Sequence, residues 1–315
     1  MQRILYVFFI CVSLAGVISP GTNAQLSEYL TMDPQQARFV YDDIHTFVHA
    51  HGLLTPGCDS VAILQSEYLD KGTPGLRMFI EKYDLTAERL VKAIRTHPEK
   101  YDSLGDLPDL ISAKEPSYRE AFVELKRLIP NAVFPRTYFL IGAYRGIGSG
   151  STEGQLISVE KWKRPLEDKR TLLIHELVHF QQVMAVGYDK YKALFGPEKN
   201  LLGLSIREGT AEFFANLVTG KITQDEAVDY TLKHERRLWH LFRKEMNGAE
   251  TGDWMWSKPS DPEQPMHVGY VLGSLIVEAY CTNANDKSKA VREILGVTDY
   301  QAFLEQSRYA EKFEE

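Results

Sequence analysis

The stretch Thr171-Leu172-Leu173-Ile174-His175-Glu176-Leu177-Val178-His179-Phe180-Gln181-Gln182 decides how the rest of this chain is organised. Its apolar residues recur on almost every side, which predicts a helix that is buried nearly all round. His175 and His179, four residues apart, share one helix face at a separation that lets a single metal ion take an imidazole from each. Glu176 is offset around the helix, where its carboxylate can reach a water held by the metal and act as a general base.

This arrangement is the His-Glu-x-x-His pattern that is typical of zinc peptidases, although five residues also recur by chance. The competing interpretation is an ordinary buried helix with two hydrogen-bonded histidines and a surface glutamate. A buried group of ionisable side chains without a metal is energetically costly. The apolar surroundings of His175, Glu176 and His179 therefore favour a metal site.

A hydrolytic zinc site needs a third protein ligand and an open position for water. Residues 205–216 predict a second helix, in which Glu208 and Glu212, four apart, share a face. We expect Glu208 to be the third ligand and Glu212 to accept the outer ring N–H of a ligand histidine. Alternatively, Ser205 and Glu208 form a capping box at the start of the helix, and Glu212 is then the ligand.

The His175-Glu176-x-x-His179 helix, followed 29 residues later by Glu208-Gly209-x-Ala211, resembles the gluzincin metallopeptidases. It is most similar to the predicted zinc-dependent proteases of bacteria that share this arrangement. The resemblance covers residues 138–280 and implies one Zn²⁺ per chain, a peptide or protein substrate, and an acidic partner at Glu212. The spacing between the histidines and the glutamate is longer than in thermolysin-like and aminopeptidase-like members, so their substrate specificity is not implied.

Residues 1–24 have the features of a secretory signal peptide. Arg3 gives the positive start, residues 4–18 form an apolar run, and Thr22-Asn23-Ala24 supplies a small-residue exit. The segment is short for a permanent membrane helix, although a retained anchor is the alternative. We therefore expect an exported protein, periplasmic or extracellular, that loses Cys11 with its signal and keeps no membrane span.

The composition is typical of a globular protein, and the whole chain has a formal net charge of −7. A mildly acidic chain has no electrostatic reason to bind nucleic acid or an anionic membrane. Cys58 and Cys281 are the cysteines left after the signal, and the sequence permits either one bridge or two free thiols.

The predicted fold class is mainly α, of the α+β type. Residues 25–130 predict a helical N-terminal lobe, with one helix that opens at Asp33-Pro34 and runs through Val48. Residues 131–315 predict a zincin-like metallopeptidase domain, with a small β-sheet beside the active-site helix and a helical C-terminal lobe. Within that domain we expect the active-site helix to start at Arg164-Pro165.

Two β-like runs, residues 137–141 and 155–159, lie just ahead of the active-site helix and are separated by a glycine-rich stretch. An edge strand can bind an extended peptide through main-chain hydrogen bonds. We therefore expect Leu156, Ile157 and Ser158 to bind substrate, and a plain hairpin loop is the alternative. Between the two metal-binding helices, aromatic residues of the segment 187–203 could border the cleft.

Residues 265–277 predict a helix in which Gly269 and Gly273 allow close packing against another helix. Tyr270, or else His267, could donate a hydrogen bond to the oxyanion that forms during peptide hydrolysis. An ordinary packing role is the alternative for both residues.

Two other functions remain open from the sequence. The first is an exported binding or scaffold protein that keeps the zincin fold without turnover, with Glu212 or His267 as a fourth ligand that closes the site. The second is a zinc hydrolase of a non-peptide bond, because the same chemistry attacks other carbonyls.

Overall fold

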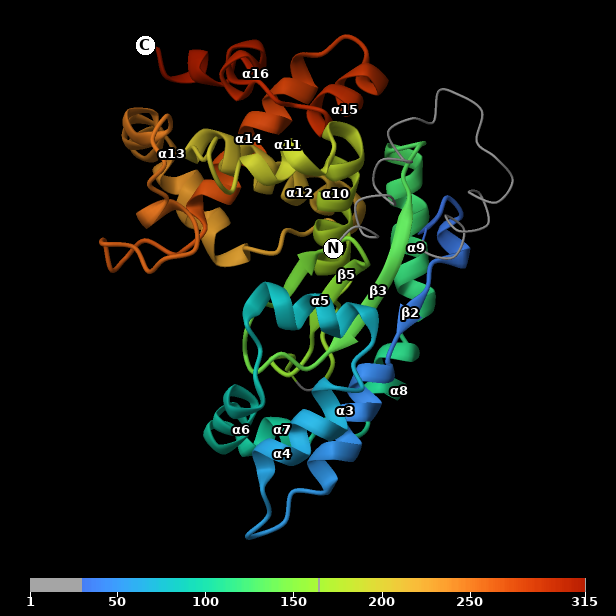
Figure 1. Cartoon of the computed structure of the whole chain (residues 1–315). Helices are drawn as coiled ribbons and strands as arrows, with labels where there is room; N and C mark the ends of the chain where they lie inside the picture. The colour runs from blue at the N-terminus through green and yellow to red at the C-terminus, as the bar shows by residue number, and fades with distance from the viewer. Residues whose placement is uncertain (1–29, 164, 315) are drawn as a thin grey trace. The chain divides into compact units, whose positions relative to one another are not determined.

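The computed structural model describes residues 30–163 and 165–314. The predicted signal peptide, residues 1–24, and Arg164 lie outside the described residues. The described chain is mainly helical with one small mixed sheet (Figure 1), which confirms the predicted α+β class.

The chain divides into two compact units. The N-terminal unit holds the described residues up to 126 together with Asn131–Leu177, and the C-terminal unit holds Arg127–Pro130 and the described residues from Val178 onward. This division differs from the expected boundary after residue 130, because strands near the N-terminus pair with the strand that begins at Phe134.

The N-terminal unit contains the sheet and nine short to medium helical segments or turns among its described residues. In chain order these are β1 Leu30–Thr31, η1 Pro34–Gln36, β2 Phe39–Val40, α3 Asp42–Gly52, α4 Ser60–Leu64, η2 Gln65–Leu69, α5 Pro74–Tyr83, α6 Ala87–Thr96, α7 Pro98–Asp102, α8 Leu107–Ser112, α9 Glu115–Leu128, β3 Phe134–Leu140, β4 Gly148–Gly150 and β5 Gly154–Ser158. Helix α10, Arg170–Val186, follows and continues into the C-terminal unit.

The predicted helix from Asp33 through Val48 is interrupted. Pro34–Gln36 forms a single turn, and the carbonyl groups of Gln35 and Ala37 accept hydrogen bonds from Arg119 Nη1 at 2.7 and 2.6 Å. The next residues form β2, which pairs parallel with β3, so α3 begins only at Asp42. Tertiary pairing of an aromatic and a β-branched residue outweighs the local helical pattern here.

The sheet has the order β1-β3-β5-β4, with β2 also paired to β3. Strands β3 and β5 are parallel, with Thr137 opposite Gln155, whereas β4 runs antiparallel to β5, with Ser149 opposite Leu156. Strand β5 is therefore an inner strand, and β4 is the edge. The prediction that Leu156, Ile157 and Ser158 bind substrate through a strand edge needs correction, because both backbone edges of their strand are paired and all three residues are buried.

Glu160 is a fully buried carboxyl group that holds the turn after β3. Its Oε1 accepts hydrogen bonds from the backbone N–H groups of Gly142 at 3.1 Å and Tyr144 at 2.7 Å. Ala143 and Tyr144 have φ angles of 54° and 63°, a left-handed conformation that is unfavourable for residues with side chains. Burial raises the pKa of Glu160 to about 7, although the backbone hydrogen bonds lower it in part.

This raised pKa predicts a pH-dependent contribution to stability. The pKa of Glu160 in the folded state lies above its ordinary value, so the fold favours the neutral carboxyl group. The free energy of unfolding of wild type is therefore highest below about pH 4.5, and this contribution is lost as the pH rises through about 7. Glu160→Gln cannot ionise, so we expect its free energy of unfolding to gain about 2 kcal/mol relative to wild type between about pH 5 and pH 8. Urea unfolding at several pH values measures this difference. The exposed control Glu81→Gln should follow wild type, and a difference that does not change with pH would contradict the prediction.

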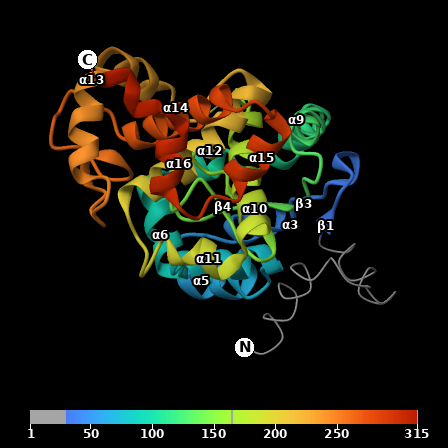
Figure 2. The ribbon, with the colours of Figure 1, turned by 90° about the horizontal axis from the view of Figure 1, so that it is seen from above.

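The C-terminal unit is helical throughout its described part. After the second half of α10 come α11 Tyr188–Ala193, α12 Leu201–Thr219, α13 Asp225–Glu245, η3 Gly252–Trp254, α14 Val268–Asn283, α15 Lys287–Leu295, α16 Tyr300–Ser307 and η4 Tyr309–Phe313. Figure 2 shows α14 over α12, with α15 and α16 beside it.

Helices α12 and α14 pack with their backbones in contact. A Cβ atom on Gly209 would lie 2.1 Å from the Gly273 carbonyl carbon, and a Cβ atom on Gly273 would lie 1.7 Å from the Ser205 carbonyl oxygen. Neither position tolerates a side chain, which confirms the prediction of close helix packing for Gly273. A Cβ atom on Gly269 would instead lie nearest to Met255 Sδ, at 2.8 Å, and to the Trp254 carbonyl oxygen, at 2.9 Å. The contact between α12 and α14 fixes α12 along the segment that carries Glu208.

Two further sequence expectations can be compared with the described residues. Cys58 and Cys281 are half-buried free thiols. Of the two alternatives, the structure therefore has the two free thiols and no bridge between them. None of the helices in the described ranges is long and apolar enough to cross a lipid bilayer.

Candidate metal centre

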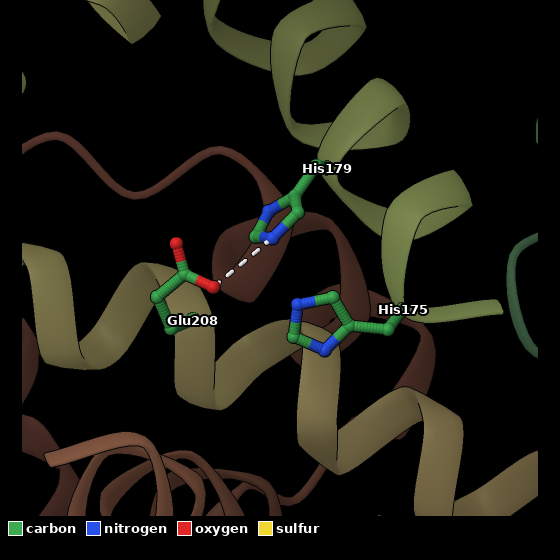
Figure 3. A group of neighbouring side chains, drawn as sticks. All are labelled: His175, His179 and Glu208. Atoms are coloured by element: carbon green, nitrogen blue, oxygen red, sulfur yellow. Dashed lines mark hydrogen bonds and ion pairs between the residues drawn. The ribbon is translucent and has the colours of Figure 1, made fainter. Parts of the chain in front are cut away.

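The side chains of His175, His179 and Glu208 converge from α10 and α12 (Figure 3). One ligand atom from each lies within 4.8 Å of the other two, and the three residues are only 5, 8 and 6% exposed. The residues that we predicted as metal ligands are therefore the ones that the structure brings together. Two imidazoles and one carboxylate form the donor set of a catalytic zinc site with an open fourth position.

Helix α10 begins later than expected. It starts at Arg170 rather than at Pro165, where the Asp168 carboxylate accepts a hydrogen bond from the Arg170 backbone N–H at 3.0 Å. His175 and His179 then lie one turn apart in the middle of the helix, well away from either end.

The capping-box alternative for Glu208 is wrong. Helix α12 begins at Leu201, and the Asn200 side chain caps it by accepting the Gly203 backbone N–H at 2.7 Å. Ser205 and Glu208 therefore lie in the helix interior, where no capping group is needed. The Glu208 carboxylate instead points at α10, and its Oε2 lies 3.2 Å from His179 Nε2.

Gln182 fixes the protonation of His179. The Gln182 Nε2 group donates to the Arg207 carbonyl oxygen at 3.0 Å, so the amide oxygen is the atom that faces His179 Nδ1 at 2.9 Å. That oxygen can only accept, which places the proton of a neutral imidazole on Nδ1. The lone pair on His179 Nε2 then faces the Glu208 carboxylate.

Two acceptors that face each other at 3.2 Å in a buried site repel unless a cation lies between them. A metal ion satisfies both atoms and also uses the neighbouring imidazole of His175. A proton on His179 Nε2 would satisfy the pair as well, but would leave His175 without a part in the arrangement. The donor set and the orientation of Gln182 together fit a metal ion.

The sequence analysis missed Gln182, although it lies three residues after His179 and so on the same helix face. Outer hydrogen bonds of this kind hold the tautomer and the ring orientation of a ligand histidine. We expect Gln182→Met to lower the zinc affinity by about 10-fold to 100-fold while the fold is kept. Competition with a chromogenic chelator measures the affinity. The exposed control Gln301→Met should bind zinc as wild type does, and an unchanged affinity in Gln182→Met would contradict the tautomer argument.

Glu212 is completely buried one turn after Glu208. Its Oε2 accepts the backbone N–H of Thr223 at 2.7 Å, and its Oε1 accepts the hydroxyl group of the same residue. These hydrogen bonds tie α12 to the start of α13. The additional hydrogen bond that Glu212 would accept from the ring N–H of a ligand histidine stays a prediction.

The Glu176 carboxylate lies directly against the edge strand β4. A Cβ atom on Gly148 would lie 2.5 Å from Glu176 Oε1, so only glycine leaves room for this carboxylate. The predicted general base is thus 6% exposed and lies beside a strand at the end of the sheet.

Tyr83, at the end of α5, is a further residue near this carboxylate. A Cβ atom on Gly146 would lie 3.0 Å from Tyr83 Cζ, so the phenol packs under the loop that leads into β4. Burial raises the pKa of Tyr83, the Ser149 hydroxyl lowers it, and the negative charge of Glu176 raises it. No local sequence pattern marks Tyr83, because it lies far from α10 along the chain.

Tyr270 and His267 lie at the start of α14. The Tyr270 hydroxyl accepts a hydrogen bond from Trp256 Nε1 at 2.7 Å. His267 has a φ angle of 68° and its ring centroid lies 5.1 Å from that of Tyr270. The oxyanion role of either residue stays a prediction.

The chain was compared with known proteins at three levels, and no family model, curated protein or solved structure matches it. The resemblance to gluzincins therefore rests on the motif residues alone.

Proposed function

We propose that this chain is an exported zinc-dependent metallopeptidase of the gluzincin type, with His175, His179 and Glu208 as the zinc ligands. The observation that carries the proposal is the contact between the lone pair of His179 Nε2 and the Glu208 carboxylate, with His175 in the same buried group. Zinc suits this donor set because it accepts two imidazoles and a carboxylate and leaves a position for water.

A bound zinc would lower the pKa of a coordinated water and polarise the scissile carbonyl group. Glu176, which follows His175 directly in α10, would take a proton from that water and give one to the leaving amine. The apolar residues around Glu176 exclude other water, which strengthens the electrostatic interactions of the site. Covalent catalysis is not required.

The edge strand β4 offers a place for an extended peptide. The Ile147 carbonyl accepts the Ser158 N–H, and Ser151 exchanges hydrogen bonds with Gly154, so these positions face β5. In an antiparallel pair the intervening residues direct their peptide groups to the opposite edge. Gly148 and Gly150 are those residues, and Gly148 also contacts Glu176. A peptide paired with β4 would pass beside the general base.

We expect alanine substitutions at Gly148 and at Gly150 to have different effects on activity. In Gly148→Ala the new Cβ atom displaces the Glu176 carboxylate, and we expect kcat to fall by about 100-fold because of the misplaced base. In Gly150→Ala the Cβ atom meets nothing within 4 Å, so kcat should stay close to wild type. Steady-state kinetics on a cleaved peptide measures both variants. Equal losses would show that Glu176 does not depend on Gly148.

The proposal is tested by metal analysis and peptide-library cleavage on one purified preparation. We expect one zinc per chain, cleavage that stops on chelation, and recovery when zinc is added back. A preparation that holds zinc but cleaves no peptide would favour the binding or scaffold protein, and cleavage of ester or amide substrates alone would favour the non-peptide hydrolase. A preparation that binds no metal would refute the site itself.

A further inference from the structure

Arg207 is a buried cation one residue before the proposed zinc ligand Glu208. Arg207 is only 3% exposed, and its Nη1 donates a hydrogen bond of 2.6 Å to the Tyr191 carbonyl oxygen. Arginine stays protonated in proteins, so this position carries a full positive charge. The metal-site argument uses only the backbone carbonyl of Arg207, and the guanidinium group has no part in it.

Aromatic rings hold the guanidinium group. Its Cζ atom lies 3.9 Å from the ring centroid of Tyr191 and 4.9 Å from that of Phe195. Cation–π contacts of this kind stabilise the charge modestly. They leave the in-plane N–H groups as the part of the side chain that can donate further hydrogen bonds.

No acidic side chain within residues 30–163 and 165–314 forms an ion pair with Arg207. A buried charge without a counter-charge is costly, and buried arginines are usually paired with carboxylates or phosphates. The Glu208 carboxylate, the next residue along α12, contacts His179 and is part of the proposed metal centre. Arg207 is thus a buried cation without a counter-charge among the described residues.

This buried cation lies next to the proposed metal centre. The Tyr191 ring that covers Arg207 also meets the ring of His179 edge-to-face, with their centroids 6.4 Å apart. One aromatic ring therefore separates the guanidinium group from a zinc ligand. Phe195 on the other side is 47% exposed, so its ring can move to admit a ligand without opening the core.

We propose that Arg207 binds a carboxylate of the substrate and makes the enzyme selective for peptides that carry one near the scissile bond. A guanidinium group recognises a carboxylate through paired, parallel hydrogen bonds, which makes this ligand class a better fit than a neutral amide. The carboxylate can come from the C-terminus of a peptide or from an Asp or Glu side chain. The link to substrate selection rests on the proposed peptidase function, but the anion site does not.

The test uses small ligands and chelator-treated, metal-free protein, so that neither turnover nor zinc affects the result. N-acetylglutamate carries both kinds of carboxylate, N-acetylglutamine keeps only the α-carboxylate, and N-acetylglutamate α-amide keeps only the side-chain carboxylate. We expect N-acetylglutamate to bind wild type, and the two half-ligands to show which carboxylate is recognised. Calorimetric titration at low ionic strength measures each affinity.

Arg207→Met keeps an unbranched apolar stem and removes the guanidinium group with its charge. We expect it to bind N-acetylglutamate at least about tenfold more weakly than wild type, which corresponds to about 1.4 kcal/mol. The control Arg243→Met removes an exposed charge from the same unit and should bind as wild type does. Should Arg207→Met fail to fold, Arg207→Lys keeps the charge but loses the planar fork, and weaker binding by that variant supports the proposal in its place.

Equal affinity of wild type and the Arg207 variants, or no binding of any of the three ligands to wild type, overturns the anion site. Cleavage assays then separate the two proposals. A zinc-loaded wild type that binds N-acetylglutamate through Arg207 but cuts no peptide refutes the peptidase function alone. An active enzyme that cuts free-acid peptides and their amidated, Asn-substituted or Gln-substituted counterparts equally well refutes the substrate preference.

Discussion

Glu176→Gln is expected to reduce peptide cleavage by about 10²-fold to 10⁴-fold while one zinc per chain is retained. The amide has the size and shape of the carboxylate, so it fills the same space against Gly148 without a clash. It cannot accept a proton from water at neutral pH, and the step that generates the nucleophile is lost. The ligand atoms of His175, His179 and Glu208 are unchanged by this substitution.

The measurement pairs metal analysis with kcat/KM on the peptide that wild type cleaves best. Glu198→Gln, which changes an exposed glutamate in the C-terminal unit, controls for the loss of one negative charge and should remain fully active. Retention of more than about a tenth of wild-type activity by Glu176→Gln would exclude Glu176 as the general base, because that loss is below the usual range for acid–base catalysis.

The central site could be predicted from the sequence because its ligands come from two short, periodic segments. The spacing of His175 and His179 places them on one helix face by geometry alone. Glu208 also follows a helical pattern, but the choice between ligand and cap depended on where α12 begins. Asn200, several residues upstream, supplies the cap and so excludes the capping role for Glu208.

The parts that the sequence did not reveal depend on contacts between distant segments. The sequence did not predict strand β4, because Gly148–Gly150 is too short and glycine-rich to show a strand pattern. The strand at the end of the sheet is therefore β4 and not β5. The expected N-terminal helix gave way to β2 because β3, almost a hundred residues later, pairs with it. Tyr83 also comes close to Glu176 through packing between distant segments, which no local sequence periodicity predicts.

Gln182 and Arg207 were missed for a different reason. Both lie within the predicted metal-binding helices, where a polar residue among apolar neighbours is a visible signal. The role of Gln182 follows from hydrogen-bond direction, since it donates to the Arg207 carbonyl and accepts from His179. The proposal for Arg207 follows from its buried charge and the aromatic rings around it. A sequence gives the donor and acceptor groups of a side chain but does not say which of them is in use.

The substitution Glu208→Gln distinguishes two explanations of the contact between His179 and Glu208, a bound metal ion or a shared proton. The substitution replaces the ligand carboxylate by an amide, and we expect zinc affinity to fall by about 10²-fold to 10⁴-fold, since each ligand carries a sizeable share of the binding free energy. In the metal-free protein the new N–H group can donate to the lone pair of His179 Nε2 and so relieve the contact between two acceptors. The metal-free variant should therefore be at least as stable as metal-free wild type.

Thermal unfolding with chelator and with added zinc measures both effects. Zinc should raise the melting temperature of wild type, because a ligand present at about 100 times its Kd stabilises the folded state by about 2.7 kcal/mol, and it should have little effect on Glu208→Gln. Glu198→Gln serves again as the control and should respond to zinc as wild type does. If a proton joined the pair instead, Glu208→Gln would break a buried ion pair and would be the less stable protein with chelator as well as with zinc. The order of the two melting temperatures in chelator thus decides between the two arrangements without any assay of activity.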